Sequence, residues 1–109
     1  MKKQKNTIHL LKTFKICQLQ HVNQYVITSD DYFIFQSYDS LIAIYDRKNS
    51  VLTVGIDWDY SNTTLKHLYI FIDEYCYVSG LNIYAYNNKK KIIKRFIKEN
   101  KIKYDAKMR

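Results

Sequence analysis

Residues 57–68 hold the side chains of this chain that come nearest to a chemical site. They include two carboxylates, four hydroxyl groups, one imidazole and the only Trp. Asp57 and Asp59 are two positions apart, so they point to the same face of an extended segment. With His67 they would offer the oxygen and imidazole ligands that bind metal ions. No flanking metal motif accompanies them, so we predict neither a metal nor another cofactor.

The same segment also fits the start of a helix at a strand-to-helix junction. In that interpretation Asp59 and Ser61 satisfy the free N–H groups and the dipole of the helix N-terminus. Trp58 and Tyr60 then pack on the core. A third interpretation is an exposed contact with a partner, because aromatic side chains beside charges make good interface anchors. It makes Trp58, Asp59 and Tyr60 predicted binding residues.

Catalysis has weaker support than binding. The Ser and Cys side chains lie in no nucleophile signature such as GxSxG, and the three His residues are scattered. The only two glycines, Gly55 and Gly80, lie far apart, which rules out a Walker or dinucleotide-binding loop. We therefore predict that the protein is not an enzyme and has no catalytic residues. A hydrolase or nuclease built on Asp57, Asp59 and His67 is the least favoured alternative.

A stronger signal lies near the C-terminus, where cationic side chains recur along one face of a predicted helix. Such an arc suits the phosphates of a nucleic acid, with an affinity that falls steeply with salt. A solvated helix face in a Lys-rich chain is the alternative interpretation. A membrane contact is not expected, because the apolar face of the helix is needed for the core. The predicted binding cations are Lys90, Lys91, Lys94, Arg95 and Lys98, and the apolar residues opposite them are Ile92, Ile93, Phe96 and Ile97.

The charge of the chain is divided along its length. Residues 1–15 carry five Lys and no acidic residue, residues 16–86 carry three basic and eight acidic residues, and residues 87–109 carry ten basic and two acidic residues. The net charge of +8 therefore comes from two basic ends around an acidic middle. A basic end usually meets phosphate, an anionic membrane or an acidic protein surface.

Length and composition favour one folded domain of the cytoplasm. A chain of 109 residues is long enough for one modest core, so we predict a single domain over 1–109 with a basic N-terminal segment 1–12 and a basic C-terminal helix and tail 88–109. No run approaches the ~20 apolar residues of a membrane span, and we expect no membrane partner. Cys17 and Cys76 are far apart without a CxxC motif or a secretory leader, which indicates reduced thiols.

The positions of the elements follow from hydrophobic periodicity. Short loops between strands require antiparallel pairing, and helical spacing of apolar residues predicts two helices. The fold class is therefore α+β, a small antiparallel sheet of three to five strands with two helices packed on it. The predicted strands span about residues 13–20, 25–28, 32–38, 41–45 and 51–56, with a short edge strand over 101–104. For residues 7–20 a helix is the alternative, because Leu10, Leu11 and Phe14 fit one helical face. The first helix starts at Ser61, Asn62 or Thr63 and extends to Cys76, and Asn88 caps the second over 89–99.

Two stretches resemble small uncharacterised proteins encoded by phages and plasmids of low-GC Gram-positive bacteria. The resemblance covers about residues 32–104 and implies no catalytic residues. It implies a phage or mobile-element origin, and small proteins of such elements often bind a host protein or its nucleic acid. The stretches are Gln36-Ser37-Tyr38-Asp39-Ser40-Leu41-Ile42-Ala43 and Trp58-Asp59-Tyr60-Ser61-x-Thr63-Thr64-x-Lys66-His67-Leu68-x-x-Phe71.

These observations predict a non-enzymatic accessory protein that acts in the host cell cytoplasm. Its expected partner is a host nucleic-acid-handling protein or nucleoprotein complex, and an anti-defence, anti-CRISPR-like inhibitor is the sharpest form of this prediction. The alternative is a small regulator that binds DNA or RNA directly through the basic C-terminal helix.

Overall fold

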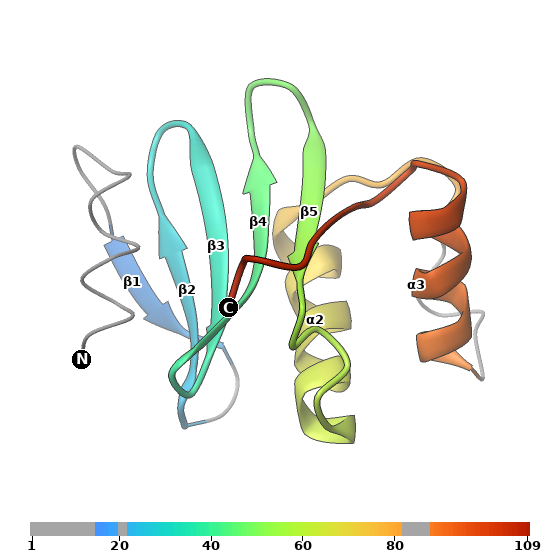
Figure 1. Cartoon of the computed structure of the whole chain (residues 1–109). Helices are drawn as coiled ribbons and strands as arrows, with labels where there is room; N and C mark the ends of the chain where they lie inside the picture. The colour runs from blue at the N-terminus through green and yellow to red at the C-terminus, as the bar shows by residue number, and fades with distance from the viewer. Residues whose placement is uncertain (1–14, 20–21, 82–87) are drawn as a thin grey trace.

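The computed structural model describes residues 15–19, 22–81 and 88–109. Their strands are β1 (Lys15–Gln18), β2 (Gln24–Thr28), β3 (Tyr32–Ser37), β4 (Ser40–Asp46), β5 (Val51–Gly55) and β6 (Lys103–Asp105), and their helices are α2 (Asn62–Tyr75) and α3 (Lys89–Lys98). The strands form one sheet in the order of the sequence. Figure 1 shows α2 behind this sheet and α3 farther to the right, beyond β5.

The predicted α+β class is confirmed, but the sheet differs from the prediction in size. Its six described strands exceed the expected three to five. β1 to β5 pair antiparallel, as their short connections require. β6 instead pairs parallel to β5, because the chain passes through both helices before it returns to the sheet. A crossover of that length permits parallel pairing.

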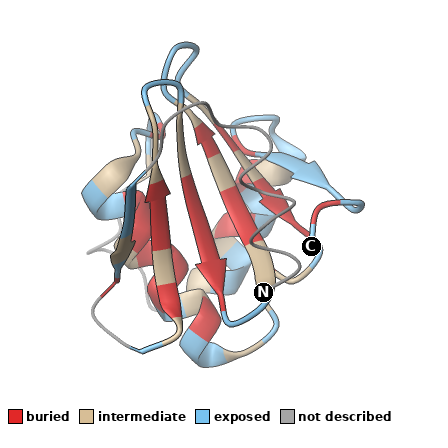
Figure 2. Ribbon diagram, turned by 90° about the vertical axis from the view of Figure 1, so that its left-hand side faces the viewer, coloured by how far each residue is buried: buried red, intermediate tan, exposed pale blue. Residues whose placement is uncertain are grey.

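The core lies between the sheet and α2. Phe33 and Phe35 of β3 face the helix, where their ring centroids lie 5.1 Å from Tyr75 and 5.6 Å from Phe71, respectively. Figure 2 shows buried residues gathered along the middle strands and exposed residues at the turns. Burying large aromatic side chains is the main stabilising contribution in a sheet and helix of this size.

Both helices begin at a residue whose side chain caps the helix N-terminus, and α3 ends shortly before a residue with a left-handed backbone. Ser61 is the N-cap of α2, and its Oγ accepts a hydrogen bond from the Thr64 N–H at 3.1 Å. Asn88 is the N-cap of α3, and its Oδ1 accepts from the Lys91 N–H at 3.1 Å. Asn100 follows α3 with a left-handed backbone at φ 60°, which ends the helix. The predicted caps Ser61 and Asn88 are therefore confirmed, with Ser61 the one of three candidates that serves α2. Asp59, also expected to satisfy this helix N-terminus, instead pairs with Lys90.

The C-terminal residues return to the end of β5. The N–H of Ile56 donates to the carbonyl oxygen of Met108 at 3.0 Å, and Met108 is buried. Gly55 permits this approach, because a Cβ at its position would clash with the Met108 carbonyl. The tail after β6 thus lies against the loop that leads from β5 to α2. Among the residues described, no helix is both long enough and apolar enough to cross a membrane.

Candidate functional site

The loop between β5 and α2, residues 56–61, directs its side chains to two different surfaces. It is turned rather than extended: the Trp58 N–H donates to the Gly55 carbonyl at 3.2 Å, and the Tyr60 N–H donates to the Asp57 carbonyl at 3.1 Å. The expectation that Asp57 and Asp59 share one face is therefore wrong. Side chains two positions apart share a face only where the backbone is extended.

The aromatic residues of the loop also differ from the expectation. Trp58 is 5 % exposed and belongs to the hydrophobic core, so the predicted exposed contact through its ring is wrong. Tyr60 is 80 % exposed, so the alternative in which it packs on the core is wrong as well. Only Tyr60 of the two rings is available to a partner.

Asp59 connects the loop to α3. Its carboxylate lies 3.3 Å from the Nζ of Lys90, in an ion pair that leaves both side chains partly exposed. Beside this pair is an open groove of about 300 Å³, lined by Ile56, Trp58, Asp59, Lys94, Ile97 and Tyr104. The groove therefore brings together residues that the sequence predicts for binding on two separate segments.

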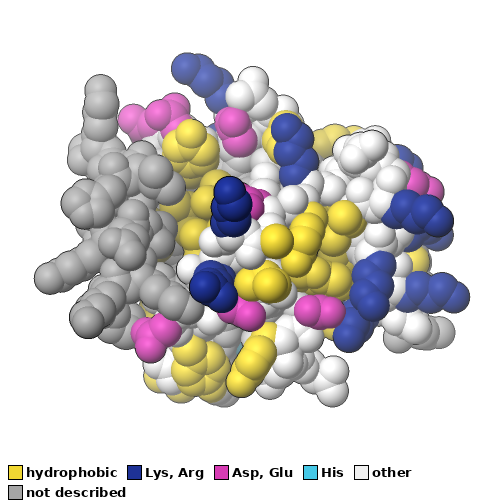
Figure 3. All heavy atoms as spheres, in the orientation of Figure 1, with side chains coloured by type: hydrophobic (Ala, Val, Ile, Leu, Met, Phe, Trp, Pro, Cys, Tyr) yellow, Lys and Arg dark blue, Asp and Glu magenta, His cyan; other side chains and the backbone are white. Residues whose placement is uncertain are grey.

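The five predicted cations of α3 are all at least partly exposed, while Ile93 and Phe96 are buried beneath them. Figure 3 shows Lys and Arg side chains gathered over α3, on the right of the molecule. Lys90 is partly neutralised by Asp59, and the Arg95 guanidinium lies 5.6 Å from the centre of the Phe96 ring. For Lys91, Lys94 and Lys98 the described part of the chain supplies no ion pair. We call the side chains of Lys90, Lys91, Lys94, Arg95 and Lys98 the α3 basic face.

The least favoured alternative, a hydrolase or nuclease on Asp57, Asp59 and His67, has no assembled site. His67 is buried, and its Nδ1 lies 2.8 Å from the Thr63 carbonyl oxygen one helical turn earlier. Among residues 15–19, 22–81 and 88–109, no three His, Cys, Asp or Glu side chains are grouped so as to hold a metal ion. Burial raises the pKa of the Cys76 thiol, which disfavours the nucleophilic thiolate.

Sequence reasoning assigns no role to the turn between β3 and β4, yet that turn forms one wall of a second hollow. We call it the acidic hollow; it measures about 490 Å³ and lies between this turn, the β5–α2 loop and the first turn of α2. The only signal in the sequence is that both walls fall within or next to the two stretches of the resemblance. Its described lining includes Ser37, Tyr38, Asp39, Asp57, Tyr60 and Ser61.

One comparison with known proteins places the chain in a family. A family model with the description "Family of unknown function (DUF8033)" matches residues 13–99. The chain belongs to this family. The DUF8033 match includes β1 to α3, and with them the α3 basic face and the acidic hollow. No curated protein and no solved structure matches the chain.

Proposed function

We propose that the protein is a non-enzymatic binding module that docks on a nucleic-acid-handling complex of the host cell through the α3 basic face. The exposure of the five cations on one side of α3 is the observation that carries this proposal. Together with the resemblance described above, it supports an accessory protein of a phage or mobile element that acts in the host cytoplasm. An anti-defence inhibitor of such a complex is its sharpest form.

The spacing of the cations suits a linear array of negative charge. Lys91, Lys94 and Lys98 follow one another at intervals of three and four residues, so they form one stripe along the helix. The stripe is about 10 Å long at ~1.5 Å per residue. Successive phosphates of one DNA strand are about 3.4 Å apart along the helix axis, so the stripe spans about three of them. Acidic side chains with a similar spacing, on a protein surface that mimics nucleic acid, would contact the stripe in the same way.

The groove beside the stripe favours direct nucleic-acid binding as a second candidate function. Tyr104 is 46 % exposed and lines the groove together with Lys94. An aromatic ring next to a cation provides a stacking surface for an unpaired base and a charge for its phosphate. The two candidates therefore share one surface and differ in what that surface contacts.

Fluorescence anisotropy with labelled single-stranded and duplex DNA and RNA, at two salt concentrations, separates the two candidates. The test variant is Lys94→Gln with Lys98→Gln, and its matched control is Lys48→Gln with Lys66→Gln, which removes the same charge from exposed positions elsewhere. Direct binding predicts that the test variant lowers the salt slope by about two, one for each substituted cation, and that the control leaves it unchanged. Equal slopes for both variants would remove the α3 basic face from nucleic-acid binding.

Capture from a nuclease-treated host lysate tests the first candidate. The wild type and the Lys48/Lys66 control should each retain the same dominant protein of a nucleic-acid-handling complex, and the Lys94/Lys98 variant should lose it. Retention of that protein by all three forms would show that a different surface makes the contact. Nothing above background in any form, together with no binding of nucleic acid at low salt, would refute the proposed function.

A further inference from the structure

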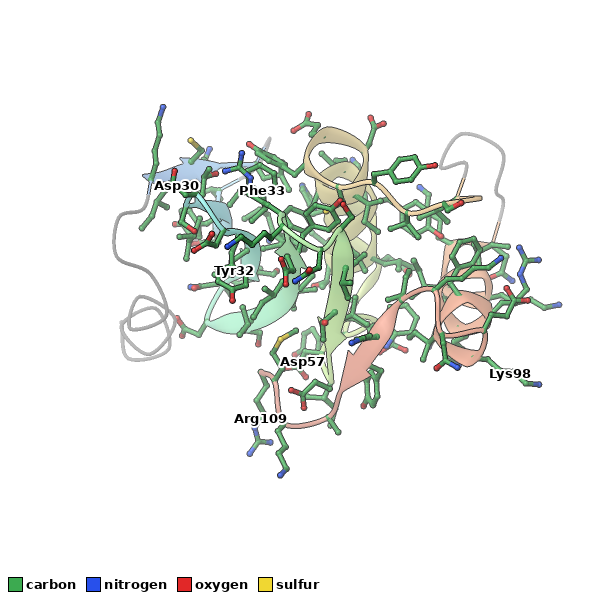
Figure 4. All side chains as sticks on the ribbon, turned by 90° about the horizontal axis from the view of Figure 1, so that it is seen from above. Asp30, Tyr32, Phe33, Asp57, Lys98 and Arg109 are labelled. Carbon is green, nitrogen blue, oxygen red and sulfur yellow. The ribbon has the colours of Figure 1, made fainter. Side chains whose placement is uncertain are left out.

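The acidic hollow has a charge opposite to that of the α3 basic face. Asp39 and Asp57 line it from the β3–β4 turn and the β5–α2 loop. The residues of its described lining include no Lys, Arg or His, although the chain as a whole carries a net charge of +8. Figure 4 shows Asp57 well separated from the outward-pointing Lys98 of α3. A cation that enters the hollow therefore meets two carboxylates and no like charge from the lining.

Ser37 supplies an independent indication of a ligand. Ser37 lines the hollow and is 3 % exposed, and its Oγ has no hydrogen-bond partner among the residues that the structure describes. Gln24, which lies opposite Ser37 in the β2–β3 register, is fully buried, and within the described part of the chain its side-chain amide has no partner either. Buried polar atoms of folded proteins are nearly always hydrogen-bonded, so an orphan hydroxyl in the wall of a hollow points to a ligand with a polar group.

Two exposed aromatic rings line the hollow beside its carboxylates. Tyr38 is 55 % exposed and Tyr60 is 80 % exposed. Tyr38 has a left-handed backbone at φ 53°, which is uncommon for a bulky residue. Two hydrogen bonds hold it there: its N–H donates to the Asn23 carbonyl at 2.7 Å, and its carbonyl accepts from the Gln36 Nε2 at 2.8 Å. The fold thus maintains a strained backbone at Tyr38, one of the residues that line the hollow.

We propose that the acidic hollow binds an organic cation, that is, an alkylammonium or guanidinium group. Asp39 and Asp57 provide the counter-charge, the Ser37 Oγ accepts a hydrogen bond from the cation, and the rings of Tyr38 and Tyr60 contact it through cation–π interactions. The site is separate from the α3 basic face and goes beyond the proposed function.

An anion would be the competing ligand, because the N-terminus of α2 also borders the hollow. A helix N-terminus carries about half a positive charge, and here the Ser61 Oγ already occupies the Thr64 N–H. The negative charge of two carboxylates exceeds that partial positive charge, so the net charge of the lining favours a cation.

Titration followed by amide shifts in ¹H–¹⁵N NMR spectra tests this site. The probes are 1,4-diaminobutane, as a free amine, and an amidated Gly-Arg-Gly peptide, as the side chain of a protein partner. Saturable shifts of the Ser37, Tyr38 and Tyr60 amides are expected with at least one probe. The probe that binds more tightly identifies the source of the cation, and either result supports the site. No saturable shift with either probe, or larger shifts at these amides with inorganic phosphate, would overturn it.

Two double variants test whether the carboxylates of Asp39 and Asp57 bind the cation. Asp39→Asn with Asp57→Asn should weaken binding of the better probe about fivefold to tenfold, as expected for one exposed and one half-buried charge contact. Asp30→Asn with Asp31→Asn is the matched control, since these acids lie in the β2–β3 turn at the opposite end of β3. Figure 4 shows Asp30 and Asp57 on different sides of the molecule. Equal weakening by both pairs, or by neither, would overturn the proposal.

Ser37→Ala separates a ligand-binding hydroxyl from a structural one. The variant removes an unpaired buried hydroxyl, so its melting temperature should equal or exceed that of the wild type. Its affinity for the better probe should nevertheless fall severalfold. A lower melting temperature with unchanged affinity would mean that Ser37 serves the fold alone and would remove it from the site.

Discussion

The α3 basic face and the acidic hollow are built in opposite ways. The α3 basic face comes from residues 90–98 of one helix, and its cations lie above a buried apolar side. The hollow combines a strand turn, a loop and the start of another helix, which are separated along the chain. The first surface depends on charge density and tolerates small displacements. The second depends on the relative positions of several backbone segments, so changes in packing affect it more strongly.

The β5–α2 loop belongs to both surfaces. Asp59 of this loop pairs with Lys90 of α3, whereas Asp57 and Tyr60 line the hollow. Trp58 lies between them in sequence and is anchored in the core. A short loop with one buried ring therefore positions acidic groups for two surfaces of opposite charge.

Replacing the anchor should have the largest effect and should disturb both surfaces together. Trp58→Ala removes a large buried ring, so we expect a loss of about 3–5 kcal/mol in the free energy of unfolding, measured by urea denaturation. That is a large share of the total stability of a small domain. Tyr60→Ala is the matched control: its ring is 80 % exposed, and the expected change stays within about 0.5 kcal/mol. Similar losses for the two variants would contradict the division of the loop into a core anchor and an exposed ring.

The comparison of the two surfaces also explains what could be predicted from the sequence. The cationic arc of α3 and the caps at Ser61 and Asn88 depend on residues within one or two helical turns, and these predictions agree with the structure. The antiparallel strands follow from alternation and from short connecting loops. Parallel β6 was expected only as a short edge strand, because its partner β5 is distant in sequence.

The acidic hollow could not be predicted because its walls meet only in the folded chain. The turn that separates Asp57 from Asp59 arises from backbone hydrogen bonds of residues 55–60, and no residue type in that stretch requires it. The register between β3 and β4 shifts after Phe35, which changes how the following residues are placed. Trp58 is likewise buried in a core cluster with members that are distant in the sequence. These are tertiary effects that override local pattern.

Substitution of either N-cap residue should have an effect of intermediate size and should affect only one of the two surfaces. Ser61→Ala and Asn88→Ala each remove one side-chain bond to a helix N–H, at an expected loss of about 0.5–2 kcal/mol in helix stability. Hydrogen exchange should accelerate at the Thr64 amide in the first variant and at the Lys91 amide in the second. Ser61→Ala should weaken organic-cation binding and leave polyanion binding intact, and Asn88→Ala should do the reverse. Loss of both activities in either variant would show that the surfaces are not independent.

The smallest expected effect concerns the ion pair between Asp59 and Lys90. Both side chains are partly exposed, so Asp59→Asn should lower the free energy of unfolding by less than about 1 kcal/mol, and high salt should reduce even that loss. The same change releases the charge of Lys90 to the α3 basic face, so polyanion binding at low salt should become tighter while organic-cation binding stays constant. Asp57→Asn is the matched control, since it removes the same charge from the same loop but from the acidic hollow. It should weaken organic-cation binding and leave the charge of Lys90 paired. If both variants tightened polyanion binding equally, the net charge of the chain would control that affinity, and the contact between Asp59 and Lys90 would have no separate role.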